Sequence, residues 1–353
     1  MWLFSLSKFL GVDIGSSHIK IAEVFKSGRR KRLNNYGFLP AASFYEKPFR
    51  TFEQNTFSLS NQEISQAIRA IIEEAGMKAR KAIFSIPDFA TLFADFELPP
   101  MTREELFEAV KYEARQHIPI PLAQTSIDWQ IIESKPVDKK RSTFKILLAA
   151  VPNDIVSQYQ EIARLSQLEL FALEAEAFSL IRALVRENEK ELIAIVDIGI
   201  QSSAVSIVEN GVLKISHSFD MSGSRLVKTV ADSFNLTLTD AEKLVIVYGL
   251  QENKEIREIL FPLIEAILKE IEKVLNEYQT KNNKKIQKII LAGGWALLPG
   301  LKEFMAENLK INIEIANPFV NVAYPSVLAE SLKKLGPSFA IAIGAALRGW
   351  SRG

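Results

Sequence analysis

The sequence predicts an α/β protein built from two lobes, and three observations lead to this prediction. The chain has 353 residues, of which 48% are hydrophobic, and this length exceeds what one compact core accommodates. Segments with the two-residue period of strands alternate with segments of helical spacing. The tetrapeptide Val-Asp-Ile-Gly occurs at 12–15 and again at 196–199. Two similar motifs in separate halves of the chain indicate two similar lobes.

Composition argues against several functional classes. Lys and Arg (43) nearly balance Asp and Glu (42), so no overall field attracts nucleic acid or an anionic membrane. Cysteine is absent, which excludes disulfides, thiol nucleophiles and thiolate metal sites and favours a reducing compartment. The three histidines, His18, His117 and His217, have no metal-ligand spacing. No segment is apolar over the roughly 20 residues that span a bilayer, so we expect a soluble, folded chain.

The first half of the chain predicts a hairpin, a helix, a strand and then an insertion. Phe9 to Val24 alternates as a hairpin around Gly15, and Ser60 to Gly76 has helical spacing between a capping serine and a terminating glycine. The pattern of the sequence changes at about Asp88, which indicates an inserted subdomain. The remaining expected elements of this half are the charged turn Gly28–Arg32, the strand Lys81–Pro87, the helix Arg103–His117, strands around Trp129 and at Phe144–Val151, and the helix Asp154–Ser166.

The second half repeats the pattern, and the predicted lobes follow from the repeat. The helix Glu174–Arg186 leads to a second hairpin, and the strand Ile289–Leu291 later runs into Gly293 and Gly294. The other expected helices are Leu226–Phe234, Thr239–Tyr248, Glu255–Glu277 and Phe339–Trp350. We predict a first lobe from 1–87 and 168–190, an inserted subdomain from 88–167, a second lobe from 191–229 and 286–353, and a helical subdomain from 230–285.

The tips of the two hairpins have the composition of a phosphate site. Glycine lets the backbone approach phosphate closely, and neighbouring N–H groups and hydroxyls donate to its oxygens. Asp13 and Asp197 end their strands, where carboxylates can hold Mg²⁺ through its waters and polarise an attacking water. Lys20 follows on the returning strand. A single Asp-Ile-Gly is usually an ordinary turn, but two copies favour a polyphosphate gripped from both sides.

A third element follows the strand Ile289–Leu291. Its glycine pair, Gly293-Gly294, opens toward a helix, and this shape can lay a nucleoside against backbone. The Gly-x-Gly-x-x-Gly spacing of dinucleotide-binding proteins is missing. An ordinary strand-to-helix turn remains the alternative for this element taken alone.

In order and spacing, these three elements resemble the superfamily of actin, the heat-shock chaperones and the sugar kinases, and within it the branch of the PilM and FtsA families. The resemblance to PilM extends over nearly the whole chain. It implies an actin-like ATPase fold, ribonuclease H-like, with two lobes and an FtsA-like inserted subdomain. The motifs that carry it are Val12–Ser17 with Ile19-Lys20, Ser85–Pro87, Ala150–Pro152, Ile195–Gly199, Ala292–Gly294 with Leu298–Leu301, Asn317–Phe319 and Ala342–Ala346.

The resemblance also implies the ligands, ATP and Mg²⁺. Hydrolysis is expected to be weak or absent, because no general base stands out beyond Asp13 or Asp197. Three positions depart from the family pattern: His18 replaces a serine, Val245 a lysine, and Trp295 a small residue, which either weakens adenosine binding or stacks on the base. The implied nucleotide-binding residues are Asp13, Gly15, Ser16, Ser17, His18 and Lys20 in the first tip, Asp197, Gly199 and Ser203 in the second, Glu242 at the ribose, and Gly293, Gly294 and Trp295 at the nucleoside.

Proteins of the PilM family are scaffolds of type IV pilus assembly, so the resemblance implies a cytoplasmic protein on the inner face of the inner membrane. The implied partner is the N-terminal tail of PilN, together with other platform or motor proteins. Membrane contact would be indirect, nucleic acid is not expected, and self-association stays open. The implied peptide groove lies where Lys81–Pro100 meets Leu147–Leu168, with Phe89, Phe93 and Phe96 either as anchors or as core.

Two rival functions stay open. An FtsA-like filament protein of cell division would carry a C-terminal amphipathic anchor, and we expect none because Phe339–Trp350 comes directly before Gly353. A small-molecule kinase would need a polar substrate pocket and a separate catalytic aspartate, and no candidate is visible. The basic turn Arg29–Arg32 is expected to be a solvated turn rather than a lipid contact.

Overall fold

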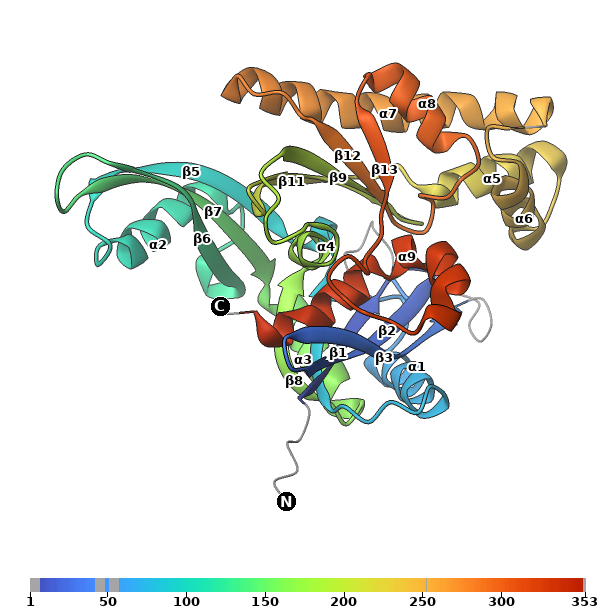
Figure 1. Cartoon of the computed structure of the whole chain (residues 1–353), viewed down its shortest axis with the longest axis horizontal. Helices are drawn as coiled ribbons and strands as arrows, with labels where there is room; N and C mark the ends of the chain where they lie inside the picture. Colours follow the sequence, from blue (N-terminus) through green and yellow to red (C-terminus); the bar gives the residue numbers. More distant parts are fainter. Residues whose placement is uncertain (1–6, 42–47, 51–56, 252, 352–353) are drawn as a thin grey trace.

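Two five-stranded sheets and one three-stranded sheet organise the chain in the computed structural model, which describes residues 7–41, 48–50, 57–251 and 253–351 (Figure 1). The first sheet has the order β3-β2-β1-β4-β8, the second β11-β10-β9-β12-β13 and the third β5-β7-β6. The strands are β1 (Lys8–Ile14), β2 (His18–Ser27), β3 (Arg30–Pro40), β4 (Lys81–Ile86), β5 (Leu92–Met101), β6 (Thr125–Pro136), β7 (Ser142–Pro152), β8 (Glu169–Ala175), β9 (Leu192–Ile198), β10 (Ser203–Glu209), β11 (Val212–Phe219), β12 (Lys288–Ala292) and β13 (Asn312–Ile315).

The two larger sheets have the same topology. In the first, β1, β2 and β3 are antiparallel neighbours, and β4 and β8 extend the sheet in parallel from β1. In the second, β9, β10 and β11 are antiparallel neighbours, and β12 and β13 extend it in parallel from β9. The duplicated hairpin in the sequence therefore marks a duplicated sheet, and the prediction of a two-lobed α/β fold is confirmed.

The helices begin and end at recognisable signals. The helices are α1 (Asn61–Glu74), α2 (Leu106–His117), α3 (Asn153–Leu165), α4 (Glu176–Leu184), α5 (Gly223–Phe234), α6 (Leu238–Tyr248), α7 (Lys254–Asn282), α8 (Leu301–Leu309) and α9 (Ala329–Leu347). Ser60 and Glu63 form a reciprocal capping box at the start of α1, and Gly76, with a φ of +63°, follows its end. The last helix begins ten residues earlier than expected from Phe339, because α9 continues through Pro337.

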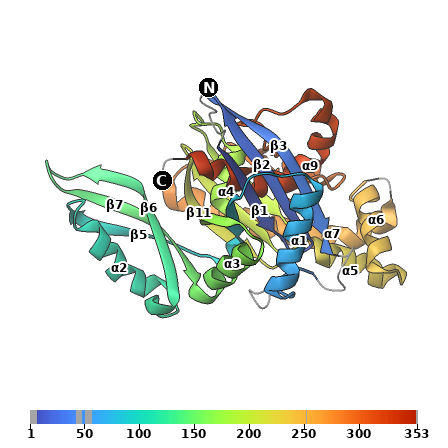
Figure 2. The ribbon, with the colours of Figure 1, turned by 90° about the horizontal axis from the view of Figure 1, so that it is seen from below.

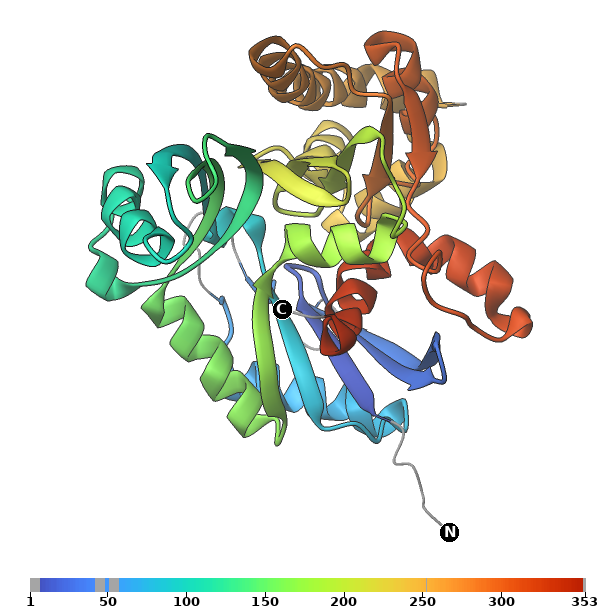
Figure 3. The same cartoon turned by 60° about the vertical axis from the view of Figure 1, so that its left-hand side comes forward.

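Helices α4 and α9 cross between the two lobes (Figure 3). Side chains of α4 pack with β9 and β12 of the second sheet, whereas Phe339, Ala342 and Ile343 of α9 pack against β2 of the first. The crossing is close: a Cβ added to Gly344 would lie 1.8 Å from the carbonyl oxygen of Ser179. The second sheet therefore packs against α4, which follows the strands of the first sheet in the chain, and the first sheet packs against α9, which follows the strands of the second.

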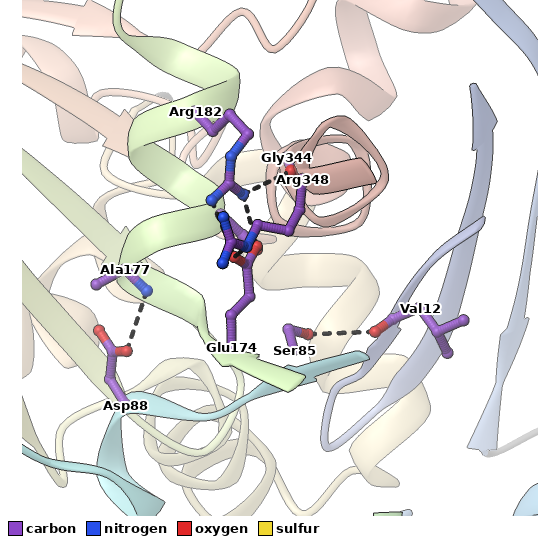
Figure 4. A network of polar contacts seen from close by, with 9 residues as sticks. Val12, Ser85, Asp88, Glu174, Ala177, Arg182, Gly344 and Arg348 are labelled. Carbon is purple, nitrogen blue, oxygen red and sulfur yellow. Dashed lines mark hydrogen bonds and ion pairs between the residues drawn. The ribbon is translucent and has the colours of Figure 1, made fainter. Parts of the chain in front are cut away.

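A charged network ties this crossing together (Figure 4). Glu174, whose side chain is 7% exposed, accepts hydrogen bonds at 2.6 and 2.9 Å from the guanidinium of Arg182, and Arg348 lies 3.6 Å away. Arg182 also donates to the carbonyl oxygen of Gly344 at 2.9 Å. The carboxylate on β8 thus holds α4 and α9 at the same point.

The three-stranded sheet forms a subdomain that stands to one side of the lobes (Figure 2). One face packs against α2, and Ile132 and Leu147 on its other side join the core between α4 and the second sheet. Phe96 is 7% exposed and stacks on His117, and the ring of Phe93 contacts that of Phe178. Phe96 is therefore a core residue, whereas Phe93 is half-buried and packs against the core between α4 and the second sheet.

The boundaries of the predicted subdomains stay predictions, and we propose one adjustment. The helix α3 was assigned to the insertion, but Ile155, Tyr159 and Ile162 of α3 pack in the core of the first sheet together with α1. We therefore place the end of the insertion near Pro152. Within the described part of the chain, no helix is both long enough and apolar enough to cross a membrane.

Candidate functional site

The two hairpin turns have the same hydrogen-bond geometry. The N–H of Gly15 donates to the carbonyl oxygen of His18 at 3.0 Å, and the N–H of Gly199 donates to that of Ser202, also at 3.0 Å. A Cβ on Gly15 would lie 3.0 Å from the oxygen of His18, and one on Gly199 would lie 2.7 Å from that of Ser202. Glycine therefore avoids the same steric contact in both turns, and the contact would be closer at Gly199 than at Gly15.

Both turns face one cavity of about 520 Å³ that residues of the two lobes line together. The cavity brings together twelve of the thirteen residues named from the sequence. The exception is Ser203, which is 1% exposed and donates to the carbonyl oxygen of Met221 at 2.5 Å. Those that line it are Asp13, Gly15, Ser16, Ser17, His18, Lys20, Asp197, Gly199, Glu242, Gly293, Gly294 and Trp295.

Carboxylates dominate the inner part of this cavity. Lys20 lies opposite Asp13 across the β1–β2 ladder, and its Nζ is 3.2 Å from the Oδ2 of Asp13. The corresponding ladder position opposite Asp197 is Ala204, which brings no cation. Burial and then the charge of Asp13 raise the pKa of Asp197 to about 7. The two hairpins therefore bring two carboxyl groups but only one lysine to the site.

Glu176 is a third carboxylate at the cavity, and the sequence reasoning missed it. It is the first residue of α4, and burial followed by the charge of Asp13 raises its pKa well above the usual range. No motif surrounds Glu176, because a glutamate in the first turn is common in helices of every function. Only the crossing of α4 between the lobes brings this residue to the cavity.

The imidazole of His18 contributes no positive charge at neutral pH. Burial and then the charge of Lys20 lower its pKa to about 4. Its Nδ1 lies 2.8 Å from the Oγ of Ser17. The replacement of a serine by His18 therefore keeps a neutral polar group in the first turn.

The glycine pair after β12 borders the cavity as expected, but the two residues differ. Gly293 has a φ of +92°, and a Cβ there would lie 2.3 Å from the carbonyl oxygen of Ile198. A Cβ on Gly294 would meet no atom within 4 Å. Gly293 is therefore fixed between β9 and α9, where its N–H donates to the carbonyl oxygen of Pro337. Gly294, in contrast, leaves room beside the cavity.

Trp295 lines the cavity, but most of its side chain lies in the core of the second lobe. The side chain is 6% exposed and belongs to the core cluster around α5 and β9. Its indole packs on Gly223, where a Cβ would lie 1.9 Å from the indole Nε1. Of the two possibilities raised by this tryptophan, stacking on a base is the one that this packing disfavours.

The outer part of the cavity combines apolar and charged groups. Glu242 lines it, and burial raises the pKa of its carboxyl group. Val245 is buried in the core, while the next residue, Ile246, reaches the cavity and is 56% exposed. Lys334 of α9 is a second lining residue that the sequence reasoning missed, and it brings a cation to the cavity, whereas Lys243 of α6 pairs with Asp240.

The donor set fits a magnesium ion held through water. Mg²⁺ prefers oxygen ligands and usually keeps several of its waters. Asp13 and Asp197 offer carboxylate oxygens from opposite lobes, while no three acidic or histidine side chains of the described residues converge closely enough to hold a metal directly. The fit is therefore to a hydrated ion.

The comparison with protein families decides the identity of the chain. A model of the family described as type IV pilus assembly protein PilM matches residues 11–350. The chain belongs to the PilM family. The predicted resemblance is confirmed, and with it a role in type IV pilus assembly.

Comparisons with individual proteins agree with the PilM assignment. A structure described as a PilM-PilN type IV pilus biogenesis complex has a TM-score of 0.85 at 24% identity, covering 97% of this chain and 98% of that chain. MreB5 of Spiroplasma citri bound to AMPPNP has a TM-score of 0.56 at 12% identity, covering 96% and 95%. The cell division protein FtsA of Staphylococcus epidermidis is 21% identical, covering 88% of this chain and 74% of FtsA. The actin-like fold is confirmed.

Proposed function

We propose that this chain is a nucleotide-binding scaffold of type IV pilus assembly, which binds Mg·ATP between its lobes and captures the N-terminal cytoplasmic tail of PilN. The observation that carries the nucleotide part is the single cavity lined by both Asp-Ile-Gly turns and by the glycine pair. Membership of the PilM family and similarity to a PilM-PilN complex support the peptide part. The proposed location is the cytoplasmic face of the inner membrane, reached through PilN.

Each group around the cavity has a proposed role. The N–H groups of the two glycine turns and the hydroxyls of Ser16 and Ser17 would donate to phosphate oxygens, and Lys20 would add charge. Asp13 and Asp197 would hold Mg²⁺ through its waters, and the bound ion would neutralise phosphate charge. Glu242 would accept from the ribose, and the backbone of Gly293 and Gly294 would border the nucleoside.

Slow or absent hydrolysis is part of the proposal. A general base must accept a proton from the attacking water. The proposal assigns Asp13 and Asp197 to Mg²⁺ and its waters, and burial and the charge of Asp13 raise the pKa of Glu176, which favours the protonated form that cannot accept a proton. We therefore propose a protein that uses ATP chiefly as a bound ligand.

A peptide-binding experiment tests the scaffold role. A labelled peptide with the sequence of the PilN tail from the same organism is titrated with the chain, and binding is followed by fluorescence anisotropy. Leu92→Asp alters an exposed apolar residue at the start of β5 inside the proposed groove region, and Phe107→Asp alters an exposed residue of α2. We expect binding by the wild type, at least ~10-fold weaker binding by Leu92→Asp, and little change for Phe107→Asp.

The peptide titration and two further assays separate the rivals. No binding of the PilN tail by the wild type would contradict the scaffold role. Filaments formed with ATP and seen by electron microscopy, without peptide binding, would favour the FtsA-like function. ATP-dependent phosphorylation of a small molecule would favour the kinase.

A further inference from the structure

Arg50 is a buried cation beside the cavity that neither the family pattern nor the proposed function uses. It lies in the short described stretch 48–50, is 5% exposed and lines the cavity. The neighbouring Phe49 donates its N–H to the carbonyl oxygen of Ser16 at 2.8 Å. The backbone of this stretch is therefore attached directly to the first phosphate turn.

The partners of the Arg50 guanidinium are aromatic. Its Nη2 donates to the hydroxyl of Tyr159 at 2.5 Å, and its Cζ lies 4.5 Å from the ring centroid of Phe57 and 5.7 Å from that of Tyr159. Among the described residues, no carboxylate lies within 4 Å of the guanidinium to form an ion pair. Aromatic rings attract a cation, but they do not neutralise its charge. Because no carboxylate of the described residues forms an ion pair with it, the guanidinium can donate to an anion that enters the cavity.

The position of Arg50 indicates which anion would bind there. The neighbouring Phe49 is hydrogen bonded to Ser16, so Arg50 lines the cavity beside the first turn, where Asp13 lies. Glu242, the proposed ribose contact, and Lys334 line the cavity from helices α6 and α9. A nucleotide whose ribose meets Glu242 and whose phosphates pass between the turns extends toward Arg50 with its last phosphate.

We propose that Arg50 binds the terminal phosphate of a nucleoside triphosphate and so makes the site prefer triphosphate over diphosphate. This inference rests on the proposed nucleotide site. The planar guanidinium can donate two parallel hydrogen bonds to phosphate oxygens. The hydroxyl of Tyr159 and the ring of Phe57 hold the guanidinium group in place. In the diphosphate complex Arg50 keeps only these aromatic partners.

The test compares ATP and ADP affinities of wild type, Arg50→Met, Arg50→Lys and the control Arg69→Met, by calorimetry at fixed Mg²⁺. Arg69 is an exposed arginine of α1 whose guanidinium donates to the carbonyl oxygen of Leu165. Loss of a charge-assisted phosphate contact is expected to weaken ATP binding by ~10- to 100-fold in Arg50→Met, and ADP binding by less than ~3-fold. Arg50→Lys keeps the positive charge but cannot donate two parallel hydrogen bonds. Its ATP affinity should fall between those of the wild type and Arg50→Met.

Several outcomes would overturn the inference. Equal weakening for ATP and ADP would show that Arg50 supports the fold of the first turn rather than the last phosphate. Unchanged ATP affinity in Arg50→Met would show that no phosphate reaches it. If Arg50→Met does not fold, the decision falls to Arg50→Lys, and an unchanged ratio of ATP to ADP affinity in that variant contradicts the proposal. A wild type that binds ADP but shows no preference for ATP overturns this inference alone, whereas one that binds neither overturns the proposed function as well.

Discussion

The pH dependence of stability without nucleotide follows from the raised pKa of Asp197. The folded protein holds a proton on this carboxyl group up to about pH 7, whereas the unfolded chain releases it near the ordinary value of 3.8. Between these values the folded state binds more protons, so the free energy of unfolding falls as the pH rises. From pH 5 to pH 7 the loss due to Asp197 is about 2 to 3 kcal/mol, at about 1.4 kcal/mol for each pH unit and with some screening by solvent in the cavity.

The variant Asp197→Asn isolates this contribution. Asparagine has nearly the same shape and does not titrate, so its free energy of unfolding should fall less steeply from pH 5 to pH 7 than that of the wild type. Urea titrations at pH 5, 6, 7 and 8 without nucleotide, followed by circular dichroism and by tryptophan fluorescence, measure both curves and test whether the two lobes unfold together. Parallel curves for wild type and variant would refute the electrostatic account of the inner cavity.

Three further substitutions and two controls test the crossing and the nucleoside turn. Glu174→Gln breaks the buried contact with two arginines and should lower the free energy of unfolding by about 3 kcal/mol, whereas Glu161→Gln, in an exposed pair, should change it by less than about 1 kcal/mol in the same urea titrations. Gly344→Ala places a methyl group on a carbonyl of α4 and should destabilise by more than about 3 kcal/mol. A thermal midpoint equal to wild type would contradict the close crossing. Gly293→Ala should weaken ATP binding at least ~10-fold because the turn must shift, while Gly294→Ala should weaken it less, and calorimetry that reverses this order would contradict the proposed roles.

The repeated elements of the fold were the easiest to predict from sequence. The hairpins around Gly15 and Gly199 carry both a two-residue period and a glycine that the turn requires, so local sequence determines local structure there. The capping box at Ser60 similarly marks the start of α1. The start of α9 was predicted wrongly because Pro337 usually ends a helix, and its place in the interior depends on tertiary packing.

The inner end of the site was not predictable for a related reason. Glu176 and Arg50 bear no motif, and each reaches the cavity through contacts between segments far apart in the chain: α4 crosses between the lobes, and the stretch at Arg50 is hydrogen bonded to the first turn. The orientation of Trp295 likewise depends on Gly223, which no spacing rule connects with it. Sequence patterns therefore identified the turns that approach a ligand, and only the packed structure identified the charges behind them.

The most direct test of the account is a calorimetric titration of Mg·ATP into wild type, Asp13→Ala, Asp197→Ala and the control Asp95→Ala. The two cavity aspartates come from opposite lobes, whereas Asp95 pairs with Lys145 on the inserted sheet. We predict one nucleotide for each wild-type chain, at least ~10-fold weaker binding in both cavity variants, and wild-type affinity in the control. Full affinity in either cavity variant would contradict a single triphosphate held between the two turns.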